Sequence, residues 1–280
     1  MEEQKFTEAR QKIEDADCIA IGIGNDLLLS EGIDIHKDND DYESYFRDFR
    51  QQHNYRNILH QCLKPLKEER QRWAYAARMY TFFLKEKKTS PALELLLKLV
   101  GGKEYFILTT NIDGRLVPTG FKEDRVFEME GSVREIQCRN GCNFTVWSAD
   151  EILPALDEAC ENCSVPEEML PKCPVCGGEA CMHIQVDRSF IQDRKWQKRY
   201  DDYRSFISNA RGKNMIFLEV GVEAGNQMIK GNFLQFLSSQ KTSSRIIIND
   251  DIPPIPYNVR EKTLCLCGRP ADMLEKILEA

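Results

Sequence analysis

The chain has 280 residues, of which 42% are hydrophobic and 30% are charged. A chain of this length buries roughly three quarters of its unfolded surface, enough for one large domain or a large domain with a small one. Its formal charge of -7 and its isoelectric point near 5.4 argue against nonspecific binding to nucleic acid or to anionic membranes, since both need basic patches.

The N-terminal stretch is charged and lacks the apolar core of a secretory signal, and no later run approaches the roughly 20 apolar residues of a membrane span. We therefore expect a cytoplasmic protein without membrane contact. In that compartment eleven cysteines, several of them closely paired, indicate metal binding rather than disulfides.

Helical and strand-like segments alternate along the chain. The periodicity predicts helices over 5–16, 66–86, 90–100, 187–211 and 271–278, and short buried strands over 18–21, 105–108, 215–222, 246–249 and 263–266. This alternation predicts an α/β fold with a doubly wound, Rossmann-like, mostly parallel sheet.

Glycines follow the first predicted strand. Gly22, Gly24, Asn25 and Asp26 lie between that strand and the next segment, and a strand, glycines and a helix form the phosphate-binding turn of dinucleotide-binding folds. As a lone pattern this motif is weak evidence.

Polar residues follow the strand at 105–108. Thr110, Asn111 and Asp113 stand where ligands bind in open α/β sheets, beyond the carboxyl end of a strand. An Asx turn would also explain the Asn and the Asp without any ligand.

Three cysteine pairs follow. Cys138 with Cys142 and Cys173 with Cys176 each form a knuckle whose thiolates converge on one metal, and Cys160 with Cys163 is a further pair. Two knuckles complete a tetrahedral zinc site, so one pair is spare or the pairs exchange. Four thiolates leave no open position, which would make the zinc structural.

The order of these motifs resembles the sirtuin family of NAD-dependent enzymes, and most closely its macrodomain-linked members. In the family a TQNID-like segment precedes a catalytic histidine before Gly-Ser, and a four-cysteine ribbon follows. Here the segments are TTNID at 109–113 and MEGS at 129–132. In the macrodomain-linked members threonine replaces the glutamine, as at Thr110, and the histidine is commonly replaced.

The resemblance implies a domain organisation and its cofactors. It implies a Rossmann-like domain over 1–135 and 183–280, with a small helical module at 34–100, and a zinc ribbon inserted at 136–182. The zinc would be held by the two pairs that flank the long insertion, namely Cys138, Cys142, Cys173 and Cys176. The implied cofactor is NAD.

The resemblance also implies roles for single residues. Asn111 would lie against the nicotinamide ribose, Asp113 would hold the carboxamide, and Glu130 stands at the position of the base. Asn249 would contact a ribose. Gly221 would lie on the adenosine side and Gly268 at the adenine end.

Acidic residues oppose the binding of a diphosphate. An ungapped alignment from Gly32 puts the family's GAG tripeptide on Gly24-Asn25-Asp26, whereas a two-residue insertion restores Gly22-Ile23-Gly24. Without the gap, Asp26 faces the pyrophosphate, and two unit charges about 4 Å apart repel by roughly 4 kcal/mol at an effective dielectric of about 20. Glu223 likewise replaces a small residue.

Two hypotheses of function follow. The first is an NAD-dependent ADP-ribosyltransferase or deacylase acting on a protein, with a lipoyl-carrier protein and a macrodomain as partners implied by the resemblance. Of these two activities, deacylation would be impaired more than transfer by Glu130 at the position of the histidine. A glutamate is a weaker base than a histidine unless burial raises its pKa. The alternative is a pseudoenzyme that binds another ligand or a protein, since Asp26, Glu130 and Glu223 are all acidic.

Overall fold

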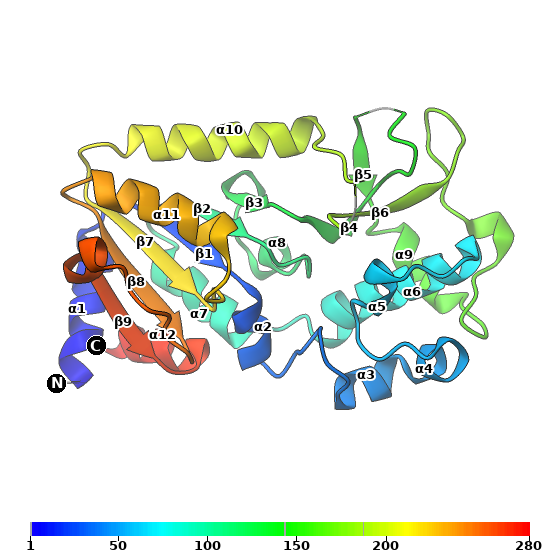
Figure 1. Cartoon of the computed structure of the whole chain (residues 1–280), viewed down its shortest axis with the longest axis horizontal. Helices are drawn as coiled ribbons and strands as arrows, with labels where there is room; N and C mark the ends of the chain where they lie inside the picture. Colours follow the sequence, from blue (N-terminus) through cyan, green and yellow to red (C-terminus); the bar gives the residue numbers. More distant parts are fainter. Residues whose placement is uncertain (1, 143, 187) are drawn as a thin grey trace.

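The computed structural model describes residues 2–142, 144–186 and 188–280 and has two lobes (Figure 1). The larger lobe is a parallel sheet with helices on both faces, and the smaller holds an antiparallel ribbon and several short helices. Both chain termini lie on the larger lobe, far from the ribbon. The predicted fold class is confirmed.

Six parallel strands form the main sheet in the order β3-β2-β1-β7-β8-β9. The chain builds one half outward from β1 and then returns to build the other half outward from β7. Ligands bind at the carboxyl ends of strands where the order reverses in this way, which here means β1 and β7. The strands are β1 (Cys18–Ile23), β2 (Glu104–Thr109), β3 (Val126–Glu128), β7 (Met215–Val220), β8 (Ser244–Asn249) and β9 (Thr263–Cys267).

Apolar side chains cover both faces of this sheet, as expected for parallel strands in the middle of a domain. Ile19 and Ile21 face α1 (Glu2–Asp15), α7 (Pro91–Val100) and α12 (Pro270–Glu279). Phe106 and Phe217 face α10 (Arg194–Asn209) and α11 (Gln227–Ser239). Ser90 caps α7 by accepting a hydrogen bond from the N–H of Leu93.

A helical module follows the first turn. It contains α2 (Asn25–Ser30), α3 (Asp40–Tyr45), α4 (Arg47–His53), α5 (His60–Leu63), α6 (Glu69–Thr81) and the π-helix η1 (Phe82–Glu86). Its interior is aromatic, with Tyr42, Phe46, Phe49 and Tyr75 all at 0% exposure. α7, which lies inside the range expected for the module, packs in the core of the sheet instead.

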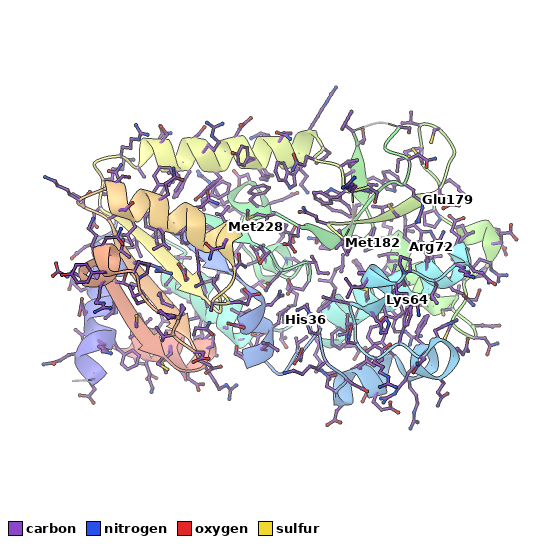
Figure 2. The ribbon with its side chains drawn as sticks, viewed as in Figure 1. His36, Lys64, Arg72, Glu179, Met182 and Met228 are labelled. Atoms are coloured by element: carbon purple, nitrogen blue, oxygen red, sulfur yellow. The ribbon has the colours of Figure 1, made fainter. Side chains whose placement is uncertain are left out.

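The ribbon is a second, three-stranded antiparallel sheet in the order β5-β4-β6. It comprises β4 (Gly131–Cys138), β5 (Val146–Ser148), β6 (Ala180–Ile184) and the adjoining α9 (Ile152–Glu158). Val133 and Ile136 share a core with the helical module, and Figure 2 shows Arg72 of α6 beside Glu179, with 3.3 Å between their charged atoms. The ribbon and the module therefore form one lobe.

The remaining helices of the described residues are short: α8 (Leu116–Thr119), η2 (Glu123–Arg125), η3 (Glu167–Met169) and η4 (Tyr257–Lys262). Across the described residues, no helix has the length and apolar character needed to cross a bilayer.

Candidate functional site

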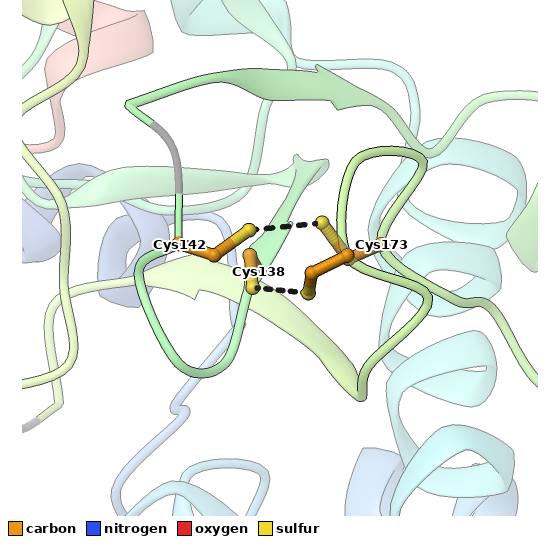
Figure 3. Close-up of side chains that lie close together, drawn as sticks. Cys138, Cys142 and Cys173 are labelled. Carbon is orange, nitrogen blue, oxygen red and sulfur yellow. Dashed lines mark hydrogen bonds between the residues drawn. The ribbon is translucent and has the colours of Figure 1, made fainter.

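Four thiols gather in the ribbon, from Cys138 at the end of β4, Cys142 after it, and Cys173 and Cys176 before β6 (Figure 3). Their sulfur atoms lie within 4.8 Å of one another. The Sγ–Sγ distance is 3.8 Å for Cys138–Cys176 and 3.5 Å for Cys142–Cys173. Thiolates about 2.3 Å from one tetrahedral ion stand about 3.8 Å apart, so the cluster fits a structural zinc ion.

The third cysteine pair lies elsewhere. Cys160 precedes, and Cys163 lies within, a tight hairpin closed by reciprocal hydrogen bonds between Glu161 and Ser164. Cys163 is buried beside Asp48 of α4. Within the described parts of the chain, the first four sulfurs form the only group of three or more potential metal ligands.

The turn after β1 contains Gly24, which immediately precedes α2. Gly22 lies inside β1, where an added Cβ atom would stand 2.4 Å from Ile229 of α11, so its small size serves packing. Of these two glycines, the structure thus places Gly24 at the turn and Gly22 within the strand. Asn25 and Asp26 are the first residues of α2.

Glu223, which follows β7, occupies the space in front of Gly24. Its Oε1 accepts a hydrogen bond from the backbone N–H of Asn25 at 2.9 Å, and its Oε2 would stand 2.2 Å from a Cβ atom added to Gly24. Asn226 Nδ2 donates to Glu223 Oε2 at 3.2 Å and to Thr110 Oγ1 at 2.8 Å. Neutral donors therefore hold the Glu223 carboxylate at the switch point, the place between β1 and β7 where the strand order reverses.

Asp26 contacts β8. Its Oδ2 accepts a hydrogen bond from Asn249 Nδ2 at 2.8 Å, and Asn249 also donates to the carbonyl of Val222 at 3.2 Å. Burial, together with the nearby Glu223 carboxylate, raises the pKa of Asp26. The ungapped alignment expects Asp26 at the phosphate position, but the carboxylate beside Gly24 belongs to Glu223.

Gly221 and Gly268 adopt left-handed backbone conformations, with φ of 58° and 150°. A Cβ atom on Gly221 would stand 2.2 Å from the backbone nitrogen of Leu27, so the end of β7 and α2 approach closely only because the side chain is absent. Gly268 donates its N–H to the carbonyl of Asn249 at 3.0 Å. Both glycines therefore lie near the residues around the turn.

Asn111 links the end of β2 to this turn. It is buried, and its Nδ2 donates to the carbonyl of Gly24 at 3.2 Å. Among the described residues, its Oδ1 has no hydrogen-bond partner. A buried acceptor left unpaired costs about 1–3 kcal/mol, so a ligand donor at this point would be stabilising. The side chain of Asn111 extends from the end of β2 to the turn after the neighbouring strand β1, which an Asx turn alone does not explain.

Asp113 is held by a buried guanidinium. Arg115, only 1% exposed, donates to Asp113 and, at 3.0 Å, to Glu31 Oε2. The hydroxyl of Ser90 also donates to Glu31. Burial opposes the charge of Arg115, but the two carboxylates outweigh it and raise its pKa. Asp113 therefore has a fixed position and a paired charge.

Glu130 lies between β3 and β4 on a fixed backbone. The N–H of Met129 donates to the carbonyl of Thr109 at 2.9 Å, and the N–H of Gln185 donates to the carbonyl of Glu130 at 2.8 Å. Burial and then Glu223 raise the pKa of Glu130. Carboxyl groups perturbed in this way are candidates for acid–base chemistry.

Glu128 is a second perturbed acid at this end of the sheet. It lies opposite Thr109 in the pairing of β3 with β2. Burial, followed by the carboxylates of Glu135 and Asp113, raises its pKa to about 8.

Arg115, Glu31 and Asn226 were not among the site residues predicted from the sequence. Asn226 had a local signal, because an asparagine three residues before buried Ile229 is typical of a helix cap, and its side chain caps α11. The pairing of Arg115 with Glu31 joins residues 84 positions apart and leaves no trace in local spacing.

The fold is that of sirtuin structures. A structure determined to explain sirtuin substrate affinity superposes with a TM-score of 0.63 at 18% identity, covering 97% of each chain. A Sir2 homologue in complex with NAD also gives a TM-score of 0.63, at 17% identity over 97% of this chain and 92% of that one. At these identities the likeness shows the fold.

Two named relatives are similar in sequence. A protein ADP-ribosyltransferase of Staphylococcus aureus is 24% identical over 261 residues, covering 92% of this chain and 82% of that protein. A probable bifunctional ADP-ribose hydrolase/ADP-ribosyltransferase of Fusarium oxysporum f. sp. cubense is 24% identical over 232 residues, which are 76% of this chain but 37% of that protein. No family model matches the chain.

Proposed function

We propose that the protein is a sirtuin-type enzyme that transfers ADP-ribose from NAD to a protein side chain. The observation that carries the proposal is the arrangement of Asn111, Asp113 and Glu130 on adjoining segments at the carboxyl ends of β2 and β3, next to the switch point. The names of both relatives support the same reaction class.

The end of the site that contains Asn111 and Asp113, which we call the ring end, fits NAD. When bound, NAD would supply an ADP-ribosyl group attached to nicotinamide, a leaving group. Asn111 Oδ1, to which none of the described residues donates, is an acceptor for a ribose hydroxyl, and Asp113, fixed by Arg115, is an acceptor for an amide N–H. The phosphate end does not fit as it stands, because Glu223 fills the space beside Gly24.

Glu130 would accept the proton of the protein nucleophile. A general base works best when its pKa lies near the ambient pH, and burial together with Glu223 shifts the pKa of Glu130 upward. We favour transfer over deacylation, since deacylation depends more on the histidine that the family carries at this position. Gly221, Asn249 and Gly268 would contact the adenosine half.

Zinc bound to Cys138, Cys142, Cys173 and Cys176 would complete the ribbon without entering the chemistry. Metal analysis of the purified protein should find one zinc ion per chain, and Cys173→Ser should lose it. A Cys160→Ser variant is the matched control and should keep the ion. Equal zinc in all three proteins would contradict the assignment.

The transfer reaction is tested with labelled NAD and candidate acceptor proteins, a lipoyl-carrier protein first because the resemblance implies it. We expect label on the acceptor with wild type, and little with Asn111→Ala or Glu130→Gln. Acyl-lysine peptides run in parallel detect deacylation. Absence of both reactions across acceptors would contradict the proposal.

One observation favours a second candidate, a pseudoenzyme that binds another ligand or a protein. Glu223 already satisfies the N–H of Asn25 at the turn after β1. If this contact is permanent, a diphosphate has no place at the turn. Titration with NAD and with ADP-ribose separates the two candidates, since a pseudoenzyme of this kind would bind neither.

A further inference from the structure

We propose that Glu223 is an internal competitor for the diphosphate of NAD and thereby sets the affinity of the site for dinucleotides. The inference rests on the function proposed above, because it assumes that NAD binds across the turn after β1. It assigns Glu223 the role of a residue that determines ligand specificity and is displaced on binding.

The contacts of Glu223 are those that a phosphate oxygen would make at this turn. One carboxylate oxygen accepts the hydrogen bond of Asn25 N–H, and the other lies in the space that Gly24 leaves open by lacking a side chain. Asn226 holds the same carboxylate from the start of α11. A ligand phosphate and the carboxylate cannot occupy this space together.

Among the described residues, the two groups that donate hydrogen bonds to the carboxylate of Glu223, the backbone N–H of Asn25 and the side-chain amide of Asn226, are neutral. Lys230 is the nearby cation that favours the charged form of Asp26. The ammonium group of Lys230, however, pairs with the buried carboxylate of Glu219 at 2.7 Å, and Arg245 pairs with the same carboxylate. Hydrogen bonds from neutral groups are weaker than those from charged donors, so an incoming anion can replace this carboxylate more easily than an ion-paired one.

The segment that carries Glu223 has room to move the side chain. Glu223 itself is partly exposed, the next two residues, Ala224 and Gly225, are exposed, and a Cβ atom on Gly225 would meet nothing within 4 Å. A rotation toward solvent would free the turn without disturbing β7. Such a rotation would also remove the acidic neighbour that raises the pKa of both Asp26 and Glu130.

The test is calorimetric titration of the zinc-loaded protein with ADP-ribose and, separately, with adenosine, which has no phosphate. Wild type is compared with Glu223→Gln, Glu223→Ala and Glu168→Gln, an exposed matched control in the ribbon lobe. We expect ADP-ribose to bind about tenfold more tightly to Glu223→Gln and about a hundredfold more tightly to Glu223→Ala. Adenosine should bind all four proteins equally. Thermal melting establishes that each variant is folded.

Three other outcomes are informative. ADP-ribose affinity that is the same in wild type and both Glu223 variants would overturn the competition while leaving the proposed function standing. Binding to the Glu223 variants but not to wild type would support the competition and contradict an active wild-type enzyme. No binding of ADP-ribose to any protein up to millimolar concentrations would overturn both, because removing the carboxylate would not have opened the site.

Discussion

The two ends of the candidate site hold their carboxylates in opposite ways. At the ring end, Asp113 and Glu31 share the buried guanidinium of Arg115. At the turn end, Asp26 and Glu223 bond to backbone and side-chain amides, and burial together with the Glu223 carboxylate raises the pKa of Asp26.

This difference indicates which groups are part of the scaffold and which respond to their surroundings. A buried charge with an ionic partner is locked in place, because removing either partner leaves an uncompensated charge in a medium of low dielectric. A carboxylate held by amides, next to other carboxylates, gains from protonation or displacement. We therefore expect the loss of an ion-pair partner at the ring end to act mainly on stability, and mutations of the carboxylates at the turn end to act on ligand binding and pH dependence.

The largest effect is expected from breaking the ring end. Arg115→Met keeps much of the side-chain volume but leaves buried Asp113 and partly buried Glu31 without a cation, which should lower the free energy of unfolding by about 3–5 kcal/mol. Urea unfolding measures the loss, and Arg211→Met, an exposed arginine, is the matched control with an expected change within about 0.5 kcal/mol. Equal stability of the two variants would mean that the ring end is not held by ionic pairing.

Glu128 sharpens the comparison, because it lies near Asp113 and yet has a pKa raised to about 8 from an ordinary value of 4.5. The folded protein retains a proton that the unfolded chain releases, so the free energy of unfolding falls as the pH rises from about 4.5 to 8. Glu128→Gln should remove this slope. It should match wild type at about pH 3.5, below the ordinary value, and exceed it by on the order of 2 kcal/mol at pH 8.5.

Urea unfolding of both proteins across this pH range decides the point. Glu168→Gln, in an exposed position, should follow the wild-type curve. If Glu128→Gln also ran parallel to wild type at every pH, Glu128 would be ionised in the folded protein and the ring end would tolerate an unpaired acid.

Most of the fold follows from local patterns, and the candidate site follows only in part. Buried runs such as residues 105–108 identify strands because apolar period and length are local properties. The cysteine spacing left three pairs open, and the resemblance to the sirtuin ribbon pointed to the four thiols that converge. The occupant of the turn could not be predicted, because Asn25 and Glu223 are 198 positions apart and their contact depends on how β1 and β7 pair. Arg115 is only two positions from Asp113, but its pairing with Glu31, 84 positions away, was not foreseen for the same reason.

The smallest effect tests whether the acids of the turn end act on one another. Asp26→Asn keeps an acceptor for Asn249 but removes a charge whose pKa is raised by burial and by Glu223, so wild-type stability falls as the pH rises above the ordinary value of 3.8. The variant should gain about 0.5–1 kcal/mol at pH 7 and nothing at pH 3.5. Because the two carboxylates repel each other, this gain should shrink when Glu223 is already Gln, with a coupling of about 0.5 kcal/mol in a double-mutant cycle.

Asp201→Asn, on the exposed face of α10, should show no coupling with Glu223→Gln. Strict additivity for Asp26 as well would mean that the carboxylates at the turn do not sense each other, and the contrast between the two ends would then lie in hydrogen bonding alone.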